Sequence, residues 1–506
     1  MTVTIDGNSL SIDDVYRVAK QGDKVTTTQD SKARIKKSRE LVDGLMKKGK
    51  TIYGINTGFG ELANRNIDDD KLEELQENLI LSHASGVGTP LEKEIVRAAM
   101  LLRANTLTKG YSGVRMVIVD TLLQMLNRGV HPVIPSKGSV GASGDLAPLA
   151  HMSLVMIGKG RAEYKGEVIS GKEAMEKADI EPVKLKAKEG LALLNGTQIM
   201  TGIGALAIRD SKILLKSAQI ASAMSLEALK GTSTPFDKRV HEIRPHTGQI
   251  ACAENILRLI ENSQIIASHV DCEKVQDPYT LRCMPQVYGA VRDTLDYVEK
   301  VINTEMNSVT DNPLIFPEGD VISCGNFHGQ PVAFAMDFLG IAVSEIGNIS
   351  ERTTDKLMYE KESGLPPFLA TDPGLNSGFM IAQYTAASLV SENKVLAHPA
   401  SVDSIPTSAG QEDHVSMGTT AARHAREIIN NVQYVVAIEL LSAAQGLEYR
   451  ELTPGKGVKA AYDFIRERVK SLDGDRELAG DIELIKGCVA SGELVNFVEK
   501  RIGEIL

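Results

Sequence analysis

Residues 198–229 read QIMTGIGALAIRDSKILLKSAQIASAMSLEAL and contain no proline. A run of this length, rich in alanine, isoleucine and leucine, predicts a single helix of about nine turns. Other segments of twenty or more residues are also typical of helices, and they lie around 247–268, 286–308, 329–358, 376–396 and 417–446. Because such helices are apolar on several faces, they favour a long-helix bundle in which some faces pack against other subunits.

The N-terminal part of the chain has shorter elements. Residues 114–128 have a helical period, and Gly129 predicts the end of that helix. Strand-like alternation is confined to short pieces such as EYKGEVIS at 163–170. We therefore expect a mainly α protein with a mostly helical N-terminal domain at 1–195 and a long-helix bundle with C-terminal helices at 196–506.

The composition argues against several classes of function. The chain of 506 residues has a net charge of −10, which disfavours nucleic acid and anionic membranes as partners. The start, MTVTIDGNSLSIDDV, lacks the features of a signal peptide and predicts a cytoplasmic protein. The apolar runs from Pro331 and Tyr434 are interrupted by acidic residues, so we expect no membrane span. Five cysteines without a Cys-x-x-Cys pair predict reduced thiols and no metal centre.

Residues 138–151, GSVGASGDLAPLAH, combine glycines with small side chains. A phosphate-binding loop would need a lysine after the last glycine, whereas Asp145 follows Gly144 and would repel the anion. A nucleophile elbow needs Gly-x-Ser-x-Gly, and Ser143 lies in GASGD, which lacks one glycine of that pattern. A sharp turn that allows tight packing stays open as a purely structural interpretation.

A further interpretation uses the backbone of Ala142, Ser143 and Gly144 itself. The amide nitrogen of Gly144 can attack the carbonyl carbon of Ala142, because glycine has no Cβ to block the approach and the neighbours are small. Loss of water closes a five-membered ring. Loss of the Ser143 hydroxyl as a second water leaves an exocyclic methylidene, so the chain would make a strong electrophile without an external cofactor.

The same segment resembles the signature of the aromatic amino acid ammonia-lyases, and further matches occur in order along nearly the whole chain. They are YGINTGFG, LSHASGVG, LLNGTQ, QDPYTLRC, GNFHGQPVA, GLPPFL, NSGFMIAQ, HPASVDSIPTS and QEDHVSMG. The resemblance implies that Ala142-Ser143-Gly144 becomes 4-methylidene-imidazole-5-one (MIO). It also implies a bundle resembling fumarase and aspartase, and a homotetramer with shared active sites.

Within the family, the chain is most similar to the members that act on L-histidine. The resemblance therefore implies non-oxidative deamination of L-histidine to trans-urocanate and ammonia, the first step of histidine degradation to glutamate. The forms LSHA and QEDH, at residues 81–84 and 411–414, carry this part of the resemblance.

The resemblance also assigns roles to single residues. Tyr53 and Tyr279 match the two active-site tyrosines, and Tyr279 is the preferred base because its neighbour Arg282 can favour a phenolate. Arg282 matches the binder of the substrate carboxylate, which a planar guanidinium meets with two hydrogen bonds. The other matches are Asn195 and Gln276, which hold the substrate or the prosthetic carbonyl, and Phe327, which walls the pocket.

The resemblance further implies that substrate choice depends on Ser82-His83 and on Glu412. Family members that act on phenylalanine or tyrosine carry Phe-Leu or His-Leu at the first pair and typically Gln at the second position. Glu412 can exchange a proton with the imidazole of the substrate, and His83 can hydrogen-bond its other nitrogen. Met380 also matches the histidine-specific form. A site built for such hydrogen bonds rejects an analogue without them by about 10⁴–10⁵-fold.

Several alternatives stay open at this stage. A tyrosine or phenylalanine ammonia-lyase would differ only at His83 and Glu412, and an aromatic aminomutase would return ammonia to the β-carbon. A nucleotide-binding protein is a further alternative, and so is a metal site at Glu412-Asp413-His414, although the latter has no second histidine at helical spacing. Gly410 and Met284 replace the family's usual Asn and Gln, which leaves loop geometry and fine affinity open.

Overall fold

The computed structural model describes the whole chain except residues 48–53, 55–56, 58–66 and 269–274. The chain divides into two compact units, each built from segments that are distant in sequence. The first unit comprises Met1–Leu206, Glu299–Asp337 and Pro399–Arg423, and the second comprises Ala207–Val298, Phe338–His398 and His424–Leu506. A single division at residue 195 stays a prediction.

The first unit is mostly helical and carries several short strands. The strands pair β1 with β2, β3 with β5 and β8 with β9, and β4, β6 and β7 form a three-stranded sheet. The elements of this unit are β1 (Thr2–Ile5), α1 (Ile12–Ala19), β2 (Lys24–Thr27), α2 (Gln29–Lys47), α3 (Leu72–His83), β3 (Val87–Pro90), α4 (Lys93–Thr108), α5 (Met116–Arg128), β4 (Val130–Pro132), β5 (Pro135–Lys137), α6 (Leu146–Met156), β6 (Arg161–Tyr164), β7 (Glu167–Ser170), α7 (Gly171–Lys177), α8 (Glu189–Leu194), β8 (Leu314–Ile315) and β9 (Val321–Ile322). The short piece with strand-like alternation at 163–170 lies within the β6–β7 hairpin, where it belongs to two paired strands, and Gly129 ends α5 as predicted.

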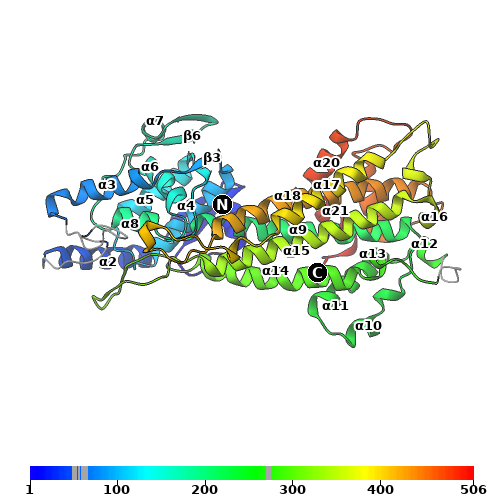
Figure 1. Ribbon diagram of the computed structural model, residues 1–506, viewed down its shortest axis with the longest axis horizontal. Helices are drawn as coiled ribbons and strands as arrows, with labels where there is room; N and C mark the ends of the chain where they lie inside the picture. The colour runs from blue at the N-terminus through cyan, green and yellow to red at the C-terminus, as the bar shows by residue number, and fades with distance from the viewer. Residues whose placement is uncertain (48–53, 55–56, 58–66, 269–274) are drawn as a thin grey trace. The chain divides into compact units, whose positions relative to one another are not determined.

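The remaining helices range from single turns of four residues to α9 and α18, which have 31 residues each. They are α9 (Gln198–Ala228), α10 (Lys238–Glu242), α11 (Thr247–Leu259), α12 (Gln264–Ala267), α13 (Tyr279–Arg282), α14 (Met284–Met306), α15 (Gln330–Met358), α16 (Glu360–Ser363), α17 (Met380–Leu396), α18 (Gly418–Glu448), α19 (Lys456–Arg466), α20 (Ala479–Ser491) and α21 (Glu493–Ile502). The prediction of a mainly α protein with long helices is confirmed (Figure 1). The prediction of one helix over 247–268 is wrong, because Asn262 adopts φ +62° and Ser263 caps a new helix by accepting the Ile266 N–H at 3.0 Å.

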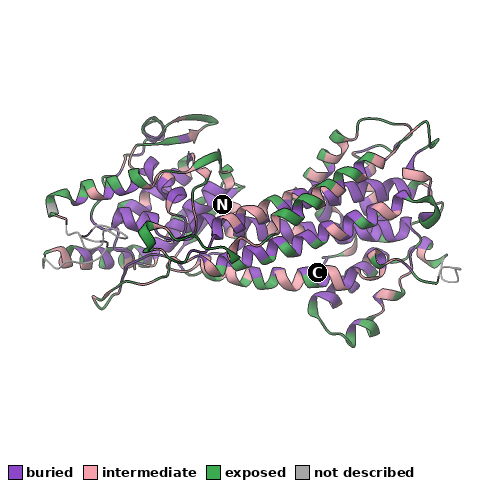
Figure 2. Cartoon of the chain, viewed as in Figure 1, coloured by how far each residue is buried: buried purple, intermediate pink, exposed green. Residues whose placement is uncertain are grey.

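Polar side chains connect the long helices within the second unit. The Ser222 hydroxyl on α9 lies 2.7 Å from the Tyr288 hydroxyl on α14, and Ser225 Oγ on α9 donates to Glu439 Oε1 on α18 at 2.9 Å. These helices lie side by side in Figure 1, and Figure 2 shows buried residues along the sides on which they face one another. The bundle core is therefore apolar with a few enclosed polar groups.

Glu439 makes the stability of this core depend on pH. Complete burial raises its pKa to about 8, against an ordinary 4.5, while hydrogen bonds from serines on neighbouring helices lower it. Since the folded pKa is raised, the stability that the neutral carboxyl contributes is full below pH 4.5 and is lost as the pH rises towards 8. We expect Glu439→Gln, which stays neutral, to raise the midpoint of thermal unfolding by several degrees at pH 8 and very little at pH 5.

The control for this measurement is Glu254→Gln, because Glu254 is an exposed side chain on α11. That variant should leave the unfolding midpoint unchanged at both pH values. An equal change for Glu439→Gln at pH 5 and pH 8 would contradict the account.

Among the residues that the structure describes, one helix, α15, is long and apolar enough to cross a membrane by length and composition. Of its most apolar window, 67% is buried inside the protein, as in a core helix. Asp337 lies within α15 but does not shorten its apolar stretch below the length that could cross a membrane. The prediction that this acidic residue interrupts the run is therefore wrong. The Asp337 carboxylate accepts the backbone N–H groups of Ala400 and Ser401 at 3.2 and 2.8 Å, which satisfies its charge.

Candidate functional site

The segment Ala142-Ser143-Gly144 lies in the loop before α6 and is held against Gly196. The Gly196 N–H donates to Ser143 O at 3.1 Å, and the Asp145 N–H donates to Gly196 O at 2.7 Å. Gly144 adopts φ +78°, and a Cβ there would lie 2.1 Å from Gly196 O. Only glycine fits this position, so the loop is closed on a backbone that a side chain would force open.

Asp145 fixes the loop to the start of α9. Its Oδ2 accepts the N–H groups of Ile199 at 2.7 Å and Met200 at 3.2 Å, and its Oδ1 accepts the Thr419 hydroxyl at 2.6 Å. Burial raises the pKa of Asp145 to about 6, although these hydrogen bonds and Arg103 lower it. An ionised carboxylate at the first turn of a helix meets unpaired N–H groups, which favours the charged form.

The closeness of Gly144 to Gly196 leads to a prediction. We expect Gly144→Ala to destabilise the protein by several kcal/mol and to abolish activity, because the new Cβ meets backbone atoms that cannot move independently. The control is Gly166→Ala, since Gly166 also has a positive φ, +87°, but nothing lies within 4 Å of its Cβ position. That variant should cost only about 1–2 kcal/mol of backbone strain. Equal shifts of the two thermal midpoints would contradict the packing argument.

A cavity of about 460 Å³ opens beside this loop. It is lined by Ala142 and Ser143 together with three predicted site residues, Asn195, Phe327 and Glu412. Asn195 is buried, and its Nδ2 donates to the carbonyl of Asn312 at 2.9 Å. The structure therefore brings these predicted residues from four separate segments to one cavity.

A second cavity, of about 350 Å³, shares Ala142 and Glu412 with the first and also contains Ser82 and His83. The Ser82 hydroxyl donates to Leu79 O at 3.1 Å, so its oxygen can accept from His83 Nδ1, also at 3.1 Å. We assign the ring proton to Nδ1 from this arrangement. Burial lowers the pKa of His83, while the charge of Glu412 raises it, so the imidazole is neutral at pH 7 with Nε2 as an acceptor.

The backbone around Glu412 is fixed by Thr407. The two residues form a backbone bridge, with the Thr407 N–H donating to Glu412 O at 3.0 Å and the Glu412 N–H donating to Thr407 O at 3.2 Å. The Thr407 hydroxyl also donates to Glu412 Oε2 at 2.6 Å. Gly410, which replaces the family's usual Asn, has φ +91°, a region that both residue types tolerate.

Tyr279, Gln276 and Arg282 form a second group, which lies in the second unit. Arg282 Nη2 donates to Gln276 Oε1 at 3.1 Å, and its guanidinium carbon lies 4.4 Å from the centroid of the Tyr279 ring. Tyr279 is 71% exposed. A cavity of about 560 Å³ adjoins this group, and Lys356 and Lys361 also line it. Asp277 and Glu362 line the same cavity, and Glu362 pairs with Lys356, so the lining keeps only a small excess of positive charge. The planar guanidinium of Arg282 is suited to a carboxylate.

Some of the residues named in the sequence analysis lie outside the part of the chain that the structure describes. Tyr53 and Cys272 lie outside the described residues, whereas Cys252, Cys283, Cys324 and Cys488 are described and free. Within the described ranges, no group of three or more His, Cys, Asp or Glu side chains could hold a metal ion. Sequence reasoning missed Asp145 and Thr407 as residues that shape the site. Asp145 had one usable signal, its place immediately before a helix.

Comparisons with known proteins give a consistent result. Residues 10–467 match the family described as aromatic amino acid lyase. The chain is 57% identical over 502 residues to a histidine ammonia-lyase of Alkaliphilus oremlandii, covering 99% of both proteins. Among solved structures, it is similar to histidine ammonia-lyase from Trypanosoma cruzi, with a TM-score of 0.92 and 41% identity, covering 99% of this chain and 96% of that one. It is also similar to tyrosine aminomutase from Streptomyces globisporus, with a TM-score of 0.94 and 39% identity over 99% of each chain.

Proposed function

The chain belongs to the aromatic amino acid lyase family, and on that basis we propose that it converts L-histidine to trans-urocanate and ammonia, the first step of histidine degradation to glutamate. One observation carries the choice of substrate. The two cavities beside Ala142 share Glu412, and one of them contains His83. A carboxylate and a neutral imidazole that accepts at Nε2 can take the two N–H groups of a substrate imidazolium, which a phenyl ring lacks.

Ala142, Ser143 and Gly144 would form the prosthetic group MIO. The residues fit this group because the Gly144 backbone is pressed against Gly196 with no room for a Cβ, and Ala142 lines both cavities. Ring closure joins Gly144 N to the Ala142 carbonyl carbon. One water carries away the Ala142 oxygen and the second carries away the Ser143 hydroxyl. Once formed, the group supplies an electrophile that withdraws electrons from the bound amino acid, so no external cofactor is required.

The other side chains would bind the substrate and move protons. Arg282 binds the α-carboxylate, and Tyr279 or Tyr53 removes the β-hydrogen. Glu412 and His83 hold the imidazole. The remaining contacts come from Asn195 and Gln276, which hold the substrate or the prosthetic carbonyl, and from Phe327, which walls the pocket.

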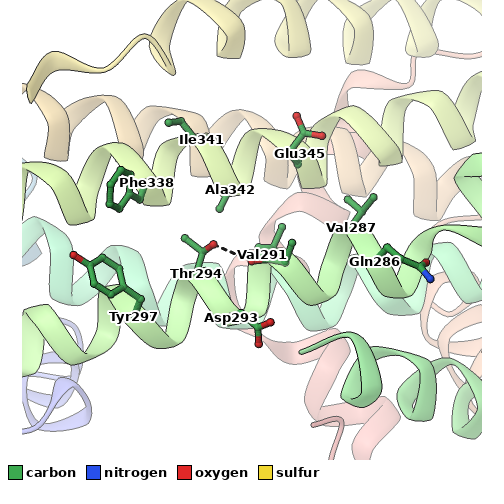
Figure 3. A pocket seen from close by; sticks show the side chains of 11 residues that line it. Gln286, Val287, Val291, Asp293, Thr294, Tyr297, Phe338, Ile341, Ala342 and Glu345 are labelled. Atoms are coloured by element: carbon green, nitrogen blue, oxygen red, sulfur yellow. Dashed lines mark hydrogen bonds between the residues drawn. The ribbon is translucent and has the colours of Figure 1, made fainter. Parts of the chain in front are cut away.

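We propose a cytoplasmic homotetramer in which more than one subunit completes each site. The support is the large exposure of Tyr279, together with an apolar groove of about 680 Å³ on α14 and α15. Figure 3 shows Tyr297 on α14 and Phe338 on α15 at one end of this groove, where their ring centroids lie 6.0 Å apart. Mixed refolding of Ser143→Ala with Arg282→Met chains, each inactive alone, should restore part of the activity if sites are shared.

The substrate is tested by following ultraviolet absorbance with histidine, tyrosine and phenylalanine side by side. Only histidine should give a conjugated product, trans-urocanate. Turnover of tyrosine or phenylalanine at a comparable rate would refute the substrate assignment. The likeness to a tyrosine aminomutase makes an aminomutase the second candidate, and it would appear as a β-amino acid in chromatography of the products.

A further inference from the structure

Four charged residues are enclosed near the Ala142-Ser143-Gly144 loop. Arg103 on α4, Asp145, Lys188 and Asp311 are all fully buried. Lys188 Nζ lies 2.8 Å from Asp311 Oδ2 and pairs with it. The four charges balance, but no carboxylate in the described part of the chain lies within ion-pair distance of Arg103.

Arg103 makes fewer hydrogen bonds than a buried arginine normally does. Its Nη1 donates to Ala192 O at 3.1 Å, whereas Nε and Nη2 are buried with no hydrogen-bond partner among the described residues. Leaving such groups unpaired destabilises the fold, so their retention needs a reason. The guanidinium packs on Gly196, since a Cβ at Gly196 would lie 2.8 Å from Nη2. Gly196 is the residue against which Gly144 is held.

The two carboxylates whose charges act on Arg103 each support one part of the site. Asp145 ties the loop to α9 through Ile199 and Met200. Asp311 Oδ1 accepts the Asn312 N–H at 2.7 Å, and the carbonyl of Asn312 accepts from Asn195 at 2.9 Å. The charges of both carboxylates raise the pKa of Arg103, and the charge of Arg103 lowers the pKa of Asp145. Burial alone would favour protonation of Asp145, which would weaken this carboxylate as an acceptor.

We propose that Arg103 is a positioning residue for formation of the prosthetic group, in which its charge keeps Asp145 ionised and its guanidinium supports Gly196 behind the closing loop. The inference rests on the proposed function, because it presupposes that the loop cyclises. Without Arg103, Asp145 would be protonated in its dry environment and would hold the loop less firmly. Gly144 N would then spend less time next to the Ala142 carbonyl.

The test is the intact mass of Arg103→Met, with Arg97→Met as the matched control. Arg97 is also a buried arginine on α4, but it donates to Val18 O and Leu126 O. We expect both variants to be destabilised to a similar degree in thermal unfolding. Most Arg103→Met chains should be heavier than mature protein by two waters, whereas Arg97→Met should be fully mature. Arg103→Lys, which restores a positive charge, should recover most of the cyclisation.

A second measurement distinguishes the effect of the Arg103 charge on Asp145 from the effect of its packing on Gly196. The charged groups that face Asp145 and Asp311 from neighbouring elements are Arg103 on α4 and Lys188 before α8. Purified uncyclised Arg103→Met, incubated at pH 7 and pH 9, should lose its two waters faster at pH 9, where Asp145 ionises without help. Base also promotes attack by an amide nitrogen, so a purely structural role predicts the same acceleration in the uncyclised fraction of Arg103→Lys, whereas the proposed role predicts a smaller one there.

The outcomes distinguish the two proposals. If wild-type protein is not lighter by two waters, the proposed function fails. If wild-type protein is lighter and folded Arg103→Met is fully mature, only the role of Arg103 fails. Should Arg103→Met not fold, Arg103→Gln replaces it, because its amide can still donate to Ala192 O. Complete maturation of that variant would overturn the inference equally.

Discussion

Replacing Ser143 by alanine should remove nearly all activity while leaving the fold intact. The activity depends on the side chain, because its Cβ becomes the methylidene carbon and its hydroxyl is the leaving group. The fold depends on the backbone, because Ser143 contributes its carbonyl to the hydrogen bond with Gly196 at 3.1 Å. Alanine retains that carbonyl, so the loop should keep its shape without forming the electrophile.

Two measurements check this expectation. The wild-type chain should be lighter than its sequence by two waters, and Ser143→Ala should retain both. The midpoint of thermal unfolding should differ little between them. Ser153→Ala is the control, because the Ser153 hydroxyl is buried in α6 and donates only to Leu149 O at 2.7 Å. That variant should be mature and active.

The reactivity of the site gives an independent check. Borohydride and cyanide attack electrophiles, so both should inactivate the wild-type protein. Pretreatment with a substrate analogue should slow this loss. Full survival of activity under both reagents, or substantial turnover by Ser143→Ala, would contradict a loop-derived electrophile.

The sequence predicted the long helices well, because proline-free apolar runs have few alternatives to a buried helix. It failed at 247–268, where the break depends on Asn262 in a left-handed conformation, which helical periodicity does not reveal. The sequence also could not predict that Gly144 and Gly196 form a parallel backbone bridge. Residues 52 positions apart along the chain meet there only because of tertiary packing.

At the candidate site, too, the sequence predicted some features and missed others. Motif matches selected Asn195, Phe327 and Glu412, which the structure places around one cavity. They could not indicate that Thr407 would fix Glu412, since that contact requires the loop to fold back on itself. The neighbours Tyr279 and Arg282 were expected to interact through the phenol group. In the structure, the guanidinium lies over the ring, as the i,i+3 spacing on a short helix allows.

Replacing Glu412 by glutamine should lower kcat/KM for histidine by about 10²–10⁴-fold, the range typical of a lost acid–base group. Glutamine has nearly the same shape, and its amide oxygen can still accept the Thr407 hydroxyl, which contacts Glu412 Oε2 at 2.6 Å in the native protein. The backbone bridge between the two residues does not involve the side chain. The variant therefore removes the charge and the transferable proton with little change in loop structure.

The matched control is Asp413→Asn, because Asp413 is the adjacent carboxylate, is exposed, and lines the same cavity as Glu412. This variant should lower kcat/KM much less. Thermal unfolding and intact mass should show that both variants are folded and mature, so the difference would reflect the substrate contact alone.

Since His83 and Glu412 act on the same imidazole, His83→Leu combined with Glu412→Gln should lose histidine turnover and gain relative preference for phenylalanine or tyrosine. Unchanged histidine kinetics in Glu412→Gln would refute the role of this carboxylate, whatever the control showed.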